Sequence, residues 1–199
     1  MSMYFENDKT IESNKQKIKI KYQDIVLDFY TDNGVFSKEK FDYGSRVLVE
    51  NLPISEMHGN ILDLGCGYGP IGIYLSKKIE NAIIDMVDVN ERAVKLAQEN
   101  IILNDVKNIK TFISDIYNSV EKTYDYIITN PPIRAGKETV RKFLIGAQYY
   151  LTTDGELWFV MRKDHGVKSM IKELENYYII ETIKKEKGFH IIKCIHKNN

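Results

Sequence analysis

The chain has 199 residues with no formal net charge, and 43% of the residues are hydrophobic while 28% are charged. These values describe one soluble globular domain, long enough to bury a substantial core without disulfides. They exclude a membrane helix, which needs ~20 consecutive apolar residues. The longest apolar runs here have only the length of strands.

The start of the chain, MSMYFENDKT, is polar and lacks the apolar segment of a signal peptide. The two cysteines, Cys66 and Cys194, form neither a disulfide framework nor a metal set with the four scattered histidines. We therefore expect a cytoplasmic protein without a metal. Residues 130–199 hold 13 Lys and Arg against 8 Asp and Glu. This excess leaves two interpretations open, an anionic partner or ordinary solvated helix faces.

Residues 1–55 are expected to form an N-terminal extension packed on a catalytic domain of residues 56–199. Residues 18–22 and part of 25–30 alternate apolar and polar side chains, which predicts a short antiparallel hairpin. A turn signal follows at Asp32-Asn33-Gly34. The spacing of Val47, Leu48 and Leu52 then predicts a short helix that ends before Pro53.

Regular alternation of strands and helices begins at residue 60. Strands are expected over residues 60–64, 82–89, 109–113, 124–129, 156–161, 177–183 and 190–195. Helices are expected up to about residue 78, after the N-cap Asn90, and over 138–150 and 167–174. This order predicts an α/β fold with a doubly wound, seven-stranded, mostly parallel sheet. Gly188 lies between the last two strands, which should form an antiparallel hairpin.

A glycine-rich turn follows the first of these strands, with the sequence Asp63-Leu64-Gly65-Cys66-Gly67-Tyr68-Gly69. Glycines allow a sharp turn and let a ligand approach the backbone at the start of a helix. The spacing G-x-G-x-G differs from the G-x-G-x-x-G of dinucleotide folds. Asp63 would repel a pyrophosphate and suits a cationic ligand. The turn therefore favours a sulfonium nucleotide such as S-adenosylmethionine, with Asp63 near its amino acid end.

Two further aspartates lie at the carboxyl ends of neighbouring strands, where such sheets bind ligands. Asp88 ends the second strand, at the distance from the glycine turn where an acidic side chain can accept the two ribose hydroxyls. Asp85 is the weaker candidate in the same strand. Asp115 follows the third strand, where a carboxylate can accept the adenine amine. Each aspartate alone suits a cap or a loop, but together with the glycines they predict a nucleotide site.

The fourth strand ends at Asn130-Pro131-Pro132-Ile133, and two consecutive prolines remove two backbone donors, so the strand cannot pair further there. The chain resembles the class I S-adenosylmethionine-dependent methyltransferases, which have a Rossmann-like fold. The resemblance rests on four motifs in this order: ILDLGCGYGPIG, VDVN, SDI and NPPI. NPPI is similar to the N/D-P-P-x signature of the branch that methylates planar nitrogens. With GVFS, DYGS and NPPIRAGK, the chain resembles the methyltransferase small domain group, which includes small-subunit rRNA guanine-N2 methyltransferases.

This resemblance implies a catalytic role for Asn130, Pro131, Pro132 and Ile133. The Asn130 side-chain oxygen and the Pro131 carbonyl would each accept one N–H of a target amine and aim its lone pair at the methyl group. The implied cofactor-binding residues are Asp63, Gly65, Cys66, Gly67, Tyr68, Gly69, Asp88, Val89, Asp115, Ile116 and Asn130. The implied reaction consumes S-adenosylmethionine, releases S-adenosylhomocysteine and uses no metal.

The expected substrate is guanine N2 in RNA, most directly ribosomal RNA or a ribosomal subunit, bound by a monomer or homodimer. Arg134, Lys137, Arg141 and the neighbouring Lys142 are candidates to contact phosphates beside the target. Ile133 has no aromatic face on which a base can stack. Phe36 or Tyr43 would supply that face, unless both are core residues.

Other interpretations remain open from the sequence. The same chemistry serves adenine N6 in nucleic acid or a glutamine amide in protein, although an aromatic residue usually follows N-P-P in glutamine modifiers. A cofactor-binding module without catalysis would belong to another class, but the glycines, the acids and N-P-P are all present here. A nicotinamide-dependent oxidoreductase is disfavoured by the glycine spacing.

Overall fold

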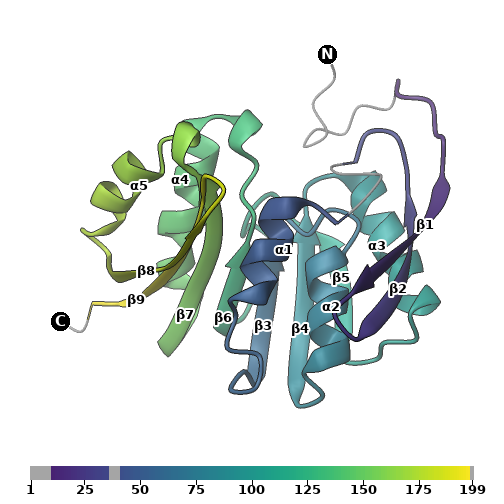
Figure 1. Cartoon of the computed structure of the whole chain (residues 1–199), viewed down its shortest axis with the longest axis horizontal. Coiled ribbons are helices and arrows are strands. Elements are labelled where there is room, and N and C mark those ends of the chain that lie inside the picture. The colour runs from purple at the N-terminus through teal and green to yellow at the C-terminus, as the bar shows by residue number, and fades with distance from the viewer. Residues whose placement is uncertain (1–9, 36–40, 198–199) are drawn as a thin grey trace.

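The computed structural model of the chain describes residues 10–35 and 41–197. Its main element is a seven-stranded sheet with the strand order β5-β4-β3-β6-β7-β9-β8 (Figure 1). The strands of this sheet are β3 (Gly59–Leu64), β4 (Ala82–Asp88), β5 (Ile109–Ile113), β6 (Tyr124–Thr129), β7 (Leu151–Arg162), β8 (Tyr178–Glu186) and β9 (Phe189–His196). Strand β9 pairs antiparallel to its neighbours β7 and β8, and the other pairs are parallel. The predicted fold class is therefore confirmed.

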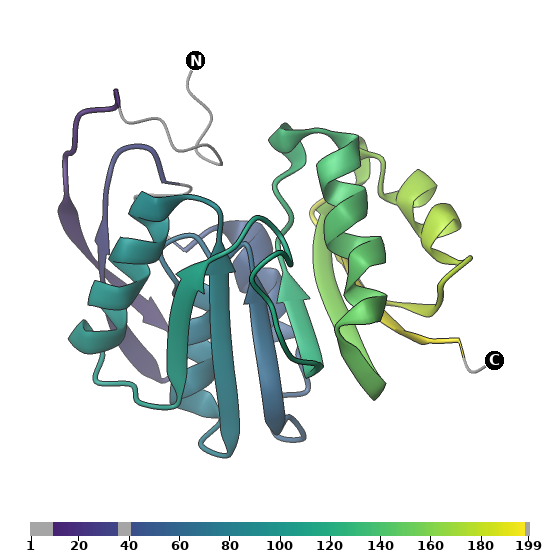
Figure 2. The ribbon, with the colours of Figure 1, turned by 180° about the vertical axis from the view of Figure 1, so that it is seen from behind.

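In the described part of the chain, the strands are connected and covered by the helices α1 (Tyr43–Glu50), α2 (Pro70–Lys78), α3 (Glu91–Leu103), α4 (Lys137–Gly146) and α5 (Val167–Leu174). Helices α1, α2 and α3 pack on one face of the sheet, and α4 and α5 pack on the other, as the view from behind shows (Figure 2). Each face has its own buried core. This arrangement leaves the carboxyl ends of β3, β4, β5, β6 and β7 together at one edge, where the connecting loops meet.

The N-terminal hairpin consists of β1 (Gln16–Tyr22) and β2 (Ile25–Thr31), which pair antiparallel as expected. It packs against α3, where Asn100 is the main anchor. The Asn100 side chain accepts a hydrogen bond from the Tyr30 backbone N at 2.6 Å and donates to the Tyr30 carbonyl at 2.9 Å. Asn100 is fully buried, so these bonds satisfy an amide that water cannot reach. The hairpin thus shares a core with α2 and α3.

The two largest differences between predicted and observed boundaries lie near glycines. The expected helix over residues 138–150 ends at Gly146, and a 3-10 turn, η2 (Ala147–Tyr149), follows. The strand expected to begin at residue 156 begins at Leu151 instead, with a register shift in its pairing with β6. Gly155 permits this irregularity, because a Cβ there would lie 2.9 Å from the Thr152 N and from the Tyr124 carbonyl oxygen.

Candidate active site

A cavity of about 600 Å³ opens at the carboxyl ends of β3 to β7. This volume lies within the usual range for small-molecule sites. Its walls come from the turn after β3, the ends of β4 and β7, and the loops after β5 and β6, together with α1 and β9. Lining residues include Asp42, Ser45, Gly65, Cys66, Gly67, Tyr68, Asp88, Val89, Asp115, Ile116, Asn130, Pro131, Pro132, Ile133, Arg134, Phe143, Arg162, His165 and Phe189. The sequence-predicted cofactor and catalytic motifs therefore meet in one space.

The glycine-rich turn forms the cavity wall that follows β3. The amides of Gly65 and Cys66 both donate to the Val87 carbonyl at 2.9 Å, which fastens the turn to β4. Gly67 has φ +57°, and a Cβ at this position would have no atom within 4 Å. The turn thus leaves open space beside its backbone, which is the cradle that a nucleotide requires.

Asp63 lies beneath this turn and does not line the cavity. One of its oxygens accepts a hydrogen bond from the Gly72 backbone N of α2 at 2.9 Å. The other oxygen is buried without a hydrogen-bond partner in the part of the chain that the structure describes. Burial raises the pKa of Asp63 from 3.8 to about 7, with Asp88 adding repulsion and the Gly72 bond opposing both. Asp63 therefore supports the turn and keeps an unused acceptor below it.

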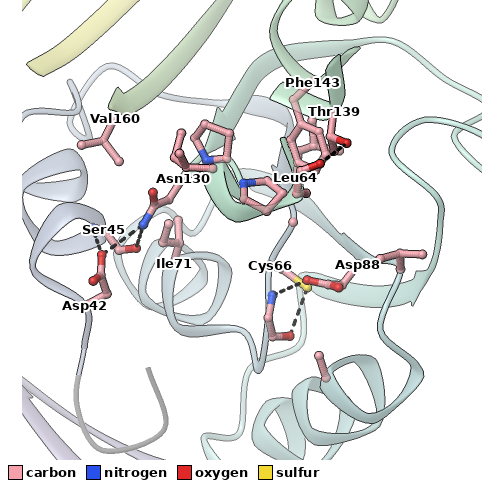
Figure 3. A pocket seen from close by; sticks show the side chains of 18 of the residues that line it. Asp42, Ser45, Leu64, Cys66, Ile71, Asp88, Asn130, Thr139, Phe143 and Val160 are labelled. Carbon is pink, nitrogen blue, oxygen red and sulfur yellow. Dashed lines mark hydrogen bonds between the residues drawn. The ribbon is translucent and has the colours of Figure 1, made fainter. Parts of the chain in front are cut away.

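Asp88 and Asp115 both line the cavity, as the sequence predicted, whereas Asp85 does not. One Asp88 oxygen accepts a hydrogen bond from the Gly67 N at 2.8 Å (Figure 3). The other accepts the Asn90 N at 2.9 Å. A carboxylate has about four acceptor sites, so each oxygen keeps capacity for a ligand hydroxyl. Burial raises the pKa of Asp88, and those amide bonds work against the rise. Asp85 instead binds the Tyr124 hydroxyl and Lys122 in the sheet interior.

The loop after β5 brings Asp115 and Ile116 to the cavity through a strained turn. Ile116 has φ +53°, which is an outlier for a β-branched residue. Ser114 holds this conformation, because its hydroxyl donates to the Ile116 carbonyl at 2.9 Å and accepts from the Ser119 N at 3.1 Å. The turn places an exposed carboxylate next to an apolar side chain at the cavity wall. That pairing suits a flat base with an exocyclic amine.

Asn130 is held by two side chains that the sequence motifs did not assign a role. Its amide nitrogen donates to an Asp42 carboxylate oxygen at 3.0 Å and to the Ser45 hydroxyl at 2.9 Å (Figure 3). Asp42 also caps α1, because the same oxygen accepts the Ser45 backbone N at 3.0 Å. A carboxylate can only accept, so it selects the orientation in which the Asn130 nitrogen faces α1. The Asn130 oxygen is left as the acceptor on the cavity side.

The two prolines that follow Asn130 both line the cavity. Ala135 N donates to the Pro132 carbonyl at 2.9 Å, which starts the short 3-10 helix η1 (Ile133–Ala135). The Pro131 carbonyl accepts no hydrogen bond from any residue that the structure describes. Thr129 anchors the base of the motif, because its hydroxyl donates to the Leu64 carbonyl at 2.8 Å. The motif thus presents two unused acceptors, the Asn130 amide oxygen and the Pro131 carbonyl.

The predicted substrate-contacting residues separate in the structure. Arg134 lines the cavity, whereas Lys137 lines a neighbouring hollow of about 240 Å³ that also contains Ile133 and His165. Arg141 lies outside both and forms ion pairs with Glu138 and Glu173. Phe36 falls outside the described residues. Lys142 also lines neither hollow. Of the four predicted phosphate contacts, the structure therefore brings only Arg134 to the cavity that holds Asn130.

An aromatic residue reaches the cavity from an element that no sequence motif indicated. Phe189, at the start of β9, lines the cavity, whereas Tyr43 does not. The Tyr43 ring lies 5.5 Å from the Phe189 ring, and its hydroxyl donates to Glu186 at 2.5 Å. Phe189 is far from Asn130 in sequence, so no local pattern connects the two. For Asp42 and Ser45 the D-x-x-S capping pattern was a signal.

Comparisons with known proteins address the identity of this fold and site. A family model described as Methyltransferase small domain matches residues 26–193. The chain belongs to the methyltransferase small domain family. The resemblance noted in the glycine-rich and N-P-P motifs is thereby confirmed. In the described residues, the structure contains no cluster of three or more potential metal ligands and no helix long and apolar enough to span a membrane.

Several relatives are similar over different shares of their length. Uncharacterized protein YbxB of Bacillus subtilis is 41% identical over 194 residues, with 96% of each chain covered. Ribosomal RNA small subunit methyltransferase C of Vibrio parahaemolyticus is 35% identical over 162 residues, which are 79% of this chain and 46% of that protein. The chain thus spans about half the length of the methyltransferase C relatives it matches.

The fold also matches solved structures. The T. thermophilus 16S rRNA N2 methyltransferase RsmC, solved in complex with AdoMet and guanosine, superposes with a TM-score of 0.82 at 22% identity. The match covers 92% of this chain and 51% of RsmC. At this level of identity the match establishes the shared fold, which agrees with the sheet and hairpin described above.

Proposed function

We propose that this protein transfers a methyl group from S-adenosylmethionine to an exocyclic amine of a nucleobase in RNA, with guanine N2 of ribosomal RNA as the substrate. One observation carries the proposal. The Asn130 amide nitrogen is fully used by Asp42 and Ser45, so its oxygen is directed to a cavity that also holds the free Pro131 carbonyl. Two acceptors on one rigid motif match the two N–H groups of a primary aromatic amine.

The residues present fit the cofactor that this reaction needs. When bound, S-adenosylmethionine supplies an electrophilic methyl group on a sulfonium. The open backbone at Gly67 is the place for its amino acid end, and Asp63 supports this turn from below through its bond to the Gly72 N. Asp88 would accept the ribose hydroxyls, and Asp115 would accept the adenine amine beside Ile116 and Phe143. Ile116 and Phe143 would provide apolar contact for a flat base.

The Asn130 motif acts on the nucleophile. The guanine amine is a weak nucleophile because its lone pair is delocalised into the ring. When Asn130 Oδ1 and the Pro131 carbonyl each accept one N–H, the nitrogen shifts toward tetrahedral geometry and its lone pair becomes available. The nitrogen would then take the methyl group as its bond to sulfur breaks, sulfur would keep the electron pair, and the nitrogen would lose one proton to solvent. Proline rings fix φ, so both acceptors keep their orientation through the reaction.

The choice of RNA guanine is supported by relatives and by one residue. Methyltransferase C relatives act, by their names, on small-subunit ribosomal RNA, and RsmC was solved with guanosine. Ile133 occupies the position that carries an aromatic residue in most glutamine modifiers, which disfavours a protein substrate. We further propose that the protein is cytoplasmic and acts as a monomer or homodimer. Residues 1–55 would form an extension packed on the catalytic domain. The hydrogen bonds from Asn130 to Asp42 and Ser45 support a role for that extension beside the proposed active site.

Transfer of tritium from labelled S-adenosylmethionine tests the proposal directly. Naked rRNA, small ribosomal subunits and total protein are offered separately, and any labelled RNA is digested to nucleosides. We expect label in N2-methylguanosine from RNA or subunits. Label in N6-methyladenosine would move the target to adenine, and label in protein would move it to an amide. No label in any fraction, with cofactor bound, would contradict a catalytic role.

A further inference from the structure

Four exposed lysines lie close in sequence to the cavity-lining residues Arg162, His165 and Phe189. We name Lys163, Lys168, Lys185 and Lys187 the basic rim. Lys163 begins the 3-10 helix η3 (Lys163–His165), and Lys168 lies in the first turn of α5. The other two lie at the end of β8 and in the β8–β9 turn, and this turn is at the same end of the strands as the start of α1 (Figure 1).

Backbone contacts bring these lysines together although they come from η3, α5 and the β8–β9 hairpin. Lys163 N donates to the Gly188 carbonyl at 2.8 Å, which fastens η3 to the hairpin turn. Met161, His190 and Lys185 are register partners across three adjacent strands, so their side chains share one face of the sheet. Burial lowers the pKa of His190, and the charges of Lys185, Lys163 and Lys168 lower it further. The positive charge of these three lysines therefore acts on one buried imidazole.

The rim lysines have no acidic partner among the residues that the structure describes, since no carboxylate lies within ion-pair distance of them. The two nearest acids in sequence are already used. Asp164 pairs with Arg162 at 3.0 Å, and Glu186 accepts the Tyr43 hydroxyl. Arg141 on α4, by contrast, is neutralised by Glu138 and Glu173. The four rim lysines thus contribute positive charge that no described carboxylate pairs with.

The basic rim continues into the cavity through Arg162, His165 and Phe189, which all line it. The Arg162 guanidinium lies 5.4 Å from the centre of the Phe189 ring. Gly44 of α1 connects this wall to the catalytic motif. A Cβ on Gly44 would lie 2.9 Å from Phe189 and 3.1 Å from the Asp42 oxygen that binds Asn130. The aromatic ring and the amine-binding oxygens therefore belong to the same end of the cavity.

We propose that the basic rim binds the phosphates of an RNA strand that flanks the target guanine, and that Phe189 contacts the base turned out of that strand. This inference deepens the proposed function and rests on it. Proteins that bind single strands combine a cationic groove along the backbone with an aromatic side chain for a base. The rim and Phe189 have this combination, and Phe189 supplies the ring that Ile133 lacks. The strand enters over the β8–β9 hairpin and η3 rather than over α4.

The test replaces Lys163, Lys168 and Lys185 with glutamine in one variant. Lys187 is kept, because its ammonium lies 5.1 Å from the Tyr43 ring and its loss would alter packing. A short fluorescein-labelled single-stranded RNA is titrated by anisotropy over a range of salt concentrations. Each lost phosphate contact lowers the salt slope by about 0.7 on a single strand, so we expect a loss of about 2. The electrostatic contribution of these contacts to RNA binding vanishes at about 1 M salt. At about 50 mM salt, the lower slope therefore corresponds to RNA binding that is roughly a few hundredfold weaker than that of the wild type.

A matched control carries glutamine at Lys77, Lys95 and Lys107, which are exposed and lie outside the cavity lining. We expect the control to bind RNA like the wild type. S-adenosylhomocysteine affinity should be unchanged in both variants, which checks the fold. An equal loss of binding in the control, or an unchanged salt slope in the rim variant, would overturn the proposal.

Further outcomes separate the rim from the proposed function. Normal RNA binding by the rim variant, combined with lost association with intact small ribosomal subunits, would mean that the surface contacts a ribosomal protein and would overturn the RNA proposal. Failure of the wild type to label any RNA would remove the proposed function itself. If the wild type labels RNA guanine but the rim variant has an unchanged KM and salt slope, only the proposed role of the basic rim would be refuted. A raised KM with little change in kcat at saturating RNA is the supporting result.

Discussion

Asp42→Asn offers a sharp test of the amine-binding geometry, because it changes one atom and preserves the fold. Asparagine caps a helix about as well as aspartate, so the bond from the Ser45 N to residue 42 can remain. The change removes the reason for the Asn130 amide to keep its nitrogen toward α1. An amide at position 42 can donate as well as accept, so the Asn130 amide can rotate and present N–H groups to the substrate amine.

The expected magnitude follows from the contact that is lost. A hydrogen bond to a charged group contributes about 1.5–3 kcal/mol, which corresponds to roughly a tenfold to hundredfold decrease in the rate of methyl transfer. The rate is measured in single-turnover reactions with saturating S-adenosylmethionine and acceptor RNA. Calorimetry with S-adenosylhomocysteine should show an unchanged Kd, since Asp42 acts through Asn130 and belongs to no cofactor motif. Ser45→Ala serves as a milder variant that keeps the carboxylate.

A double replacement distinguishes orientation from general damage. Asn130→Asp alone would place two carboxylates about 3 Å apart and should lose most activity through repulsion. Asp42→Asn with Asn130→Asp restores one donor and one acceptor in reversed positions, and it still leaves an oxygen toward the cavity. We expect the activity of the double variant to exceed the product of the two single effects. Full activity of Asp42→Asn, or additive losses in the double variant, would refute the orientation argument.

Three other predictions concern the same site. Asn130→Ala should lower methyl transfer by about a hundredfold while S-adenosylhomocysteine affinity is nearly intact; an active Asn130→Ala variant would remove the amide from the mechanism. S-adenosylmethionine should raise the Tm whereas NAD should not, and a flat response to S-adenosylmethionine and S-adenosylhomocysteine would contradict the cofactor assignment. Asp63 has a folded-state pKa of about 7, above the ordinary 3.8, so the folded protein holds this proton more tightly than the unfolded chain. Stability should therefore fall as the pH rises from about 4 to about 7, by up to about 4 kcal/mol. Urea unfolding at both ends of that range should show this fall in the wild type and a smaller fall in Asp63→Asn; equal falls would show that Asp63 is not protonated in the fold.

Much of the fold could be predicted from the sequence because its patterns are local. Strands β5 and β6 and helix α5 have the predicted bounds, since each apolar run is closed by clear turn or cap residues. The Asn90 cap was also predicted, and its side chain accepts the Arg92 and Ala93 amides. The glycine-rich turn, Asp88, Asp115 and Asn130 reach one cavity because parallel strands bring their carboxyl ends to one edge.

What the local patterns did not contain is the set of partners that each side chain meets. Arg141 and Arg134 look equivalent in sequence, but a glutamate on α5 and one on α4 neutralise Arg141, while Arg134 lines the cavity. Asp63 precedes the glycines as a ligand-facing acid would, yet the chain turns over it and buries it. The pairing and burial of these side chains depend on contacts between residues far apart in the chain, which local sequence patterns do not predict.

The amino-acid sequence alone determined the class of the protein, the order of its elements and most of the motifs that meet in the cavity, because strand and helix periods and turn residues act over a few positions. Only the tertiary structure decided which side chains surround the proposed amine-binding oxygens. Packing of α1 against the sheet brings Asp42 to Asn130 from far along the chain, and pairing of β9 with β7 brings Phe189 to the same cavity. Both contacts require strand pairing between distant parts of the chain. They determine the direction of the Asn130 amide oxygen and the position of the Phe189 ring.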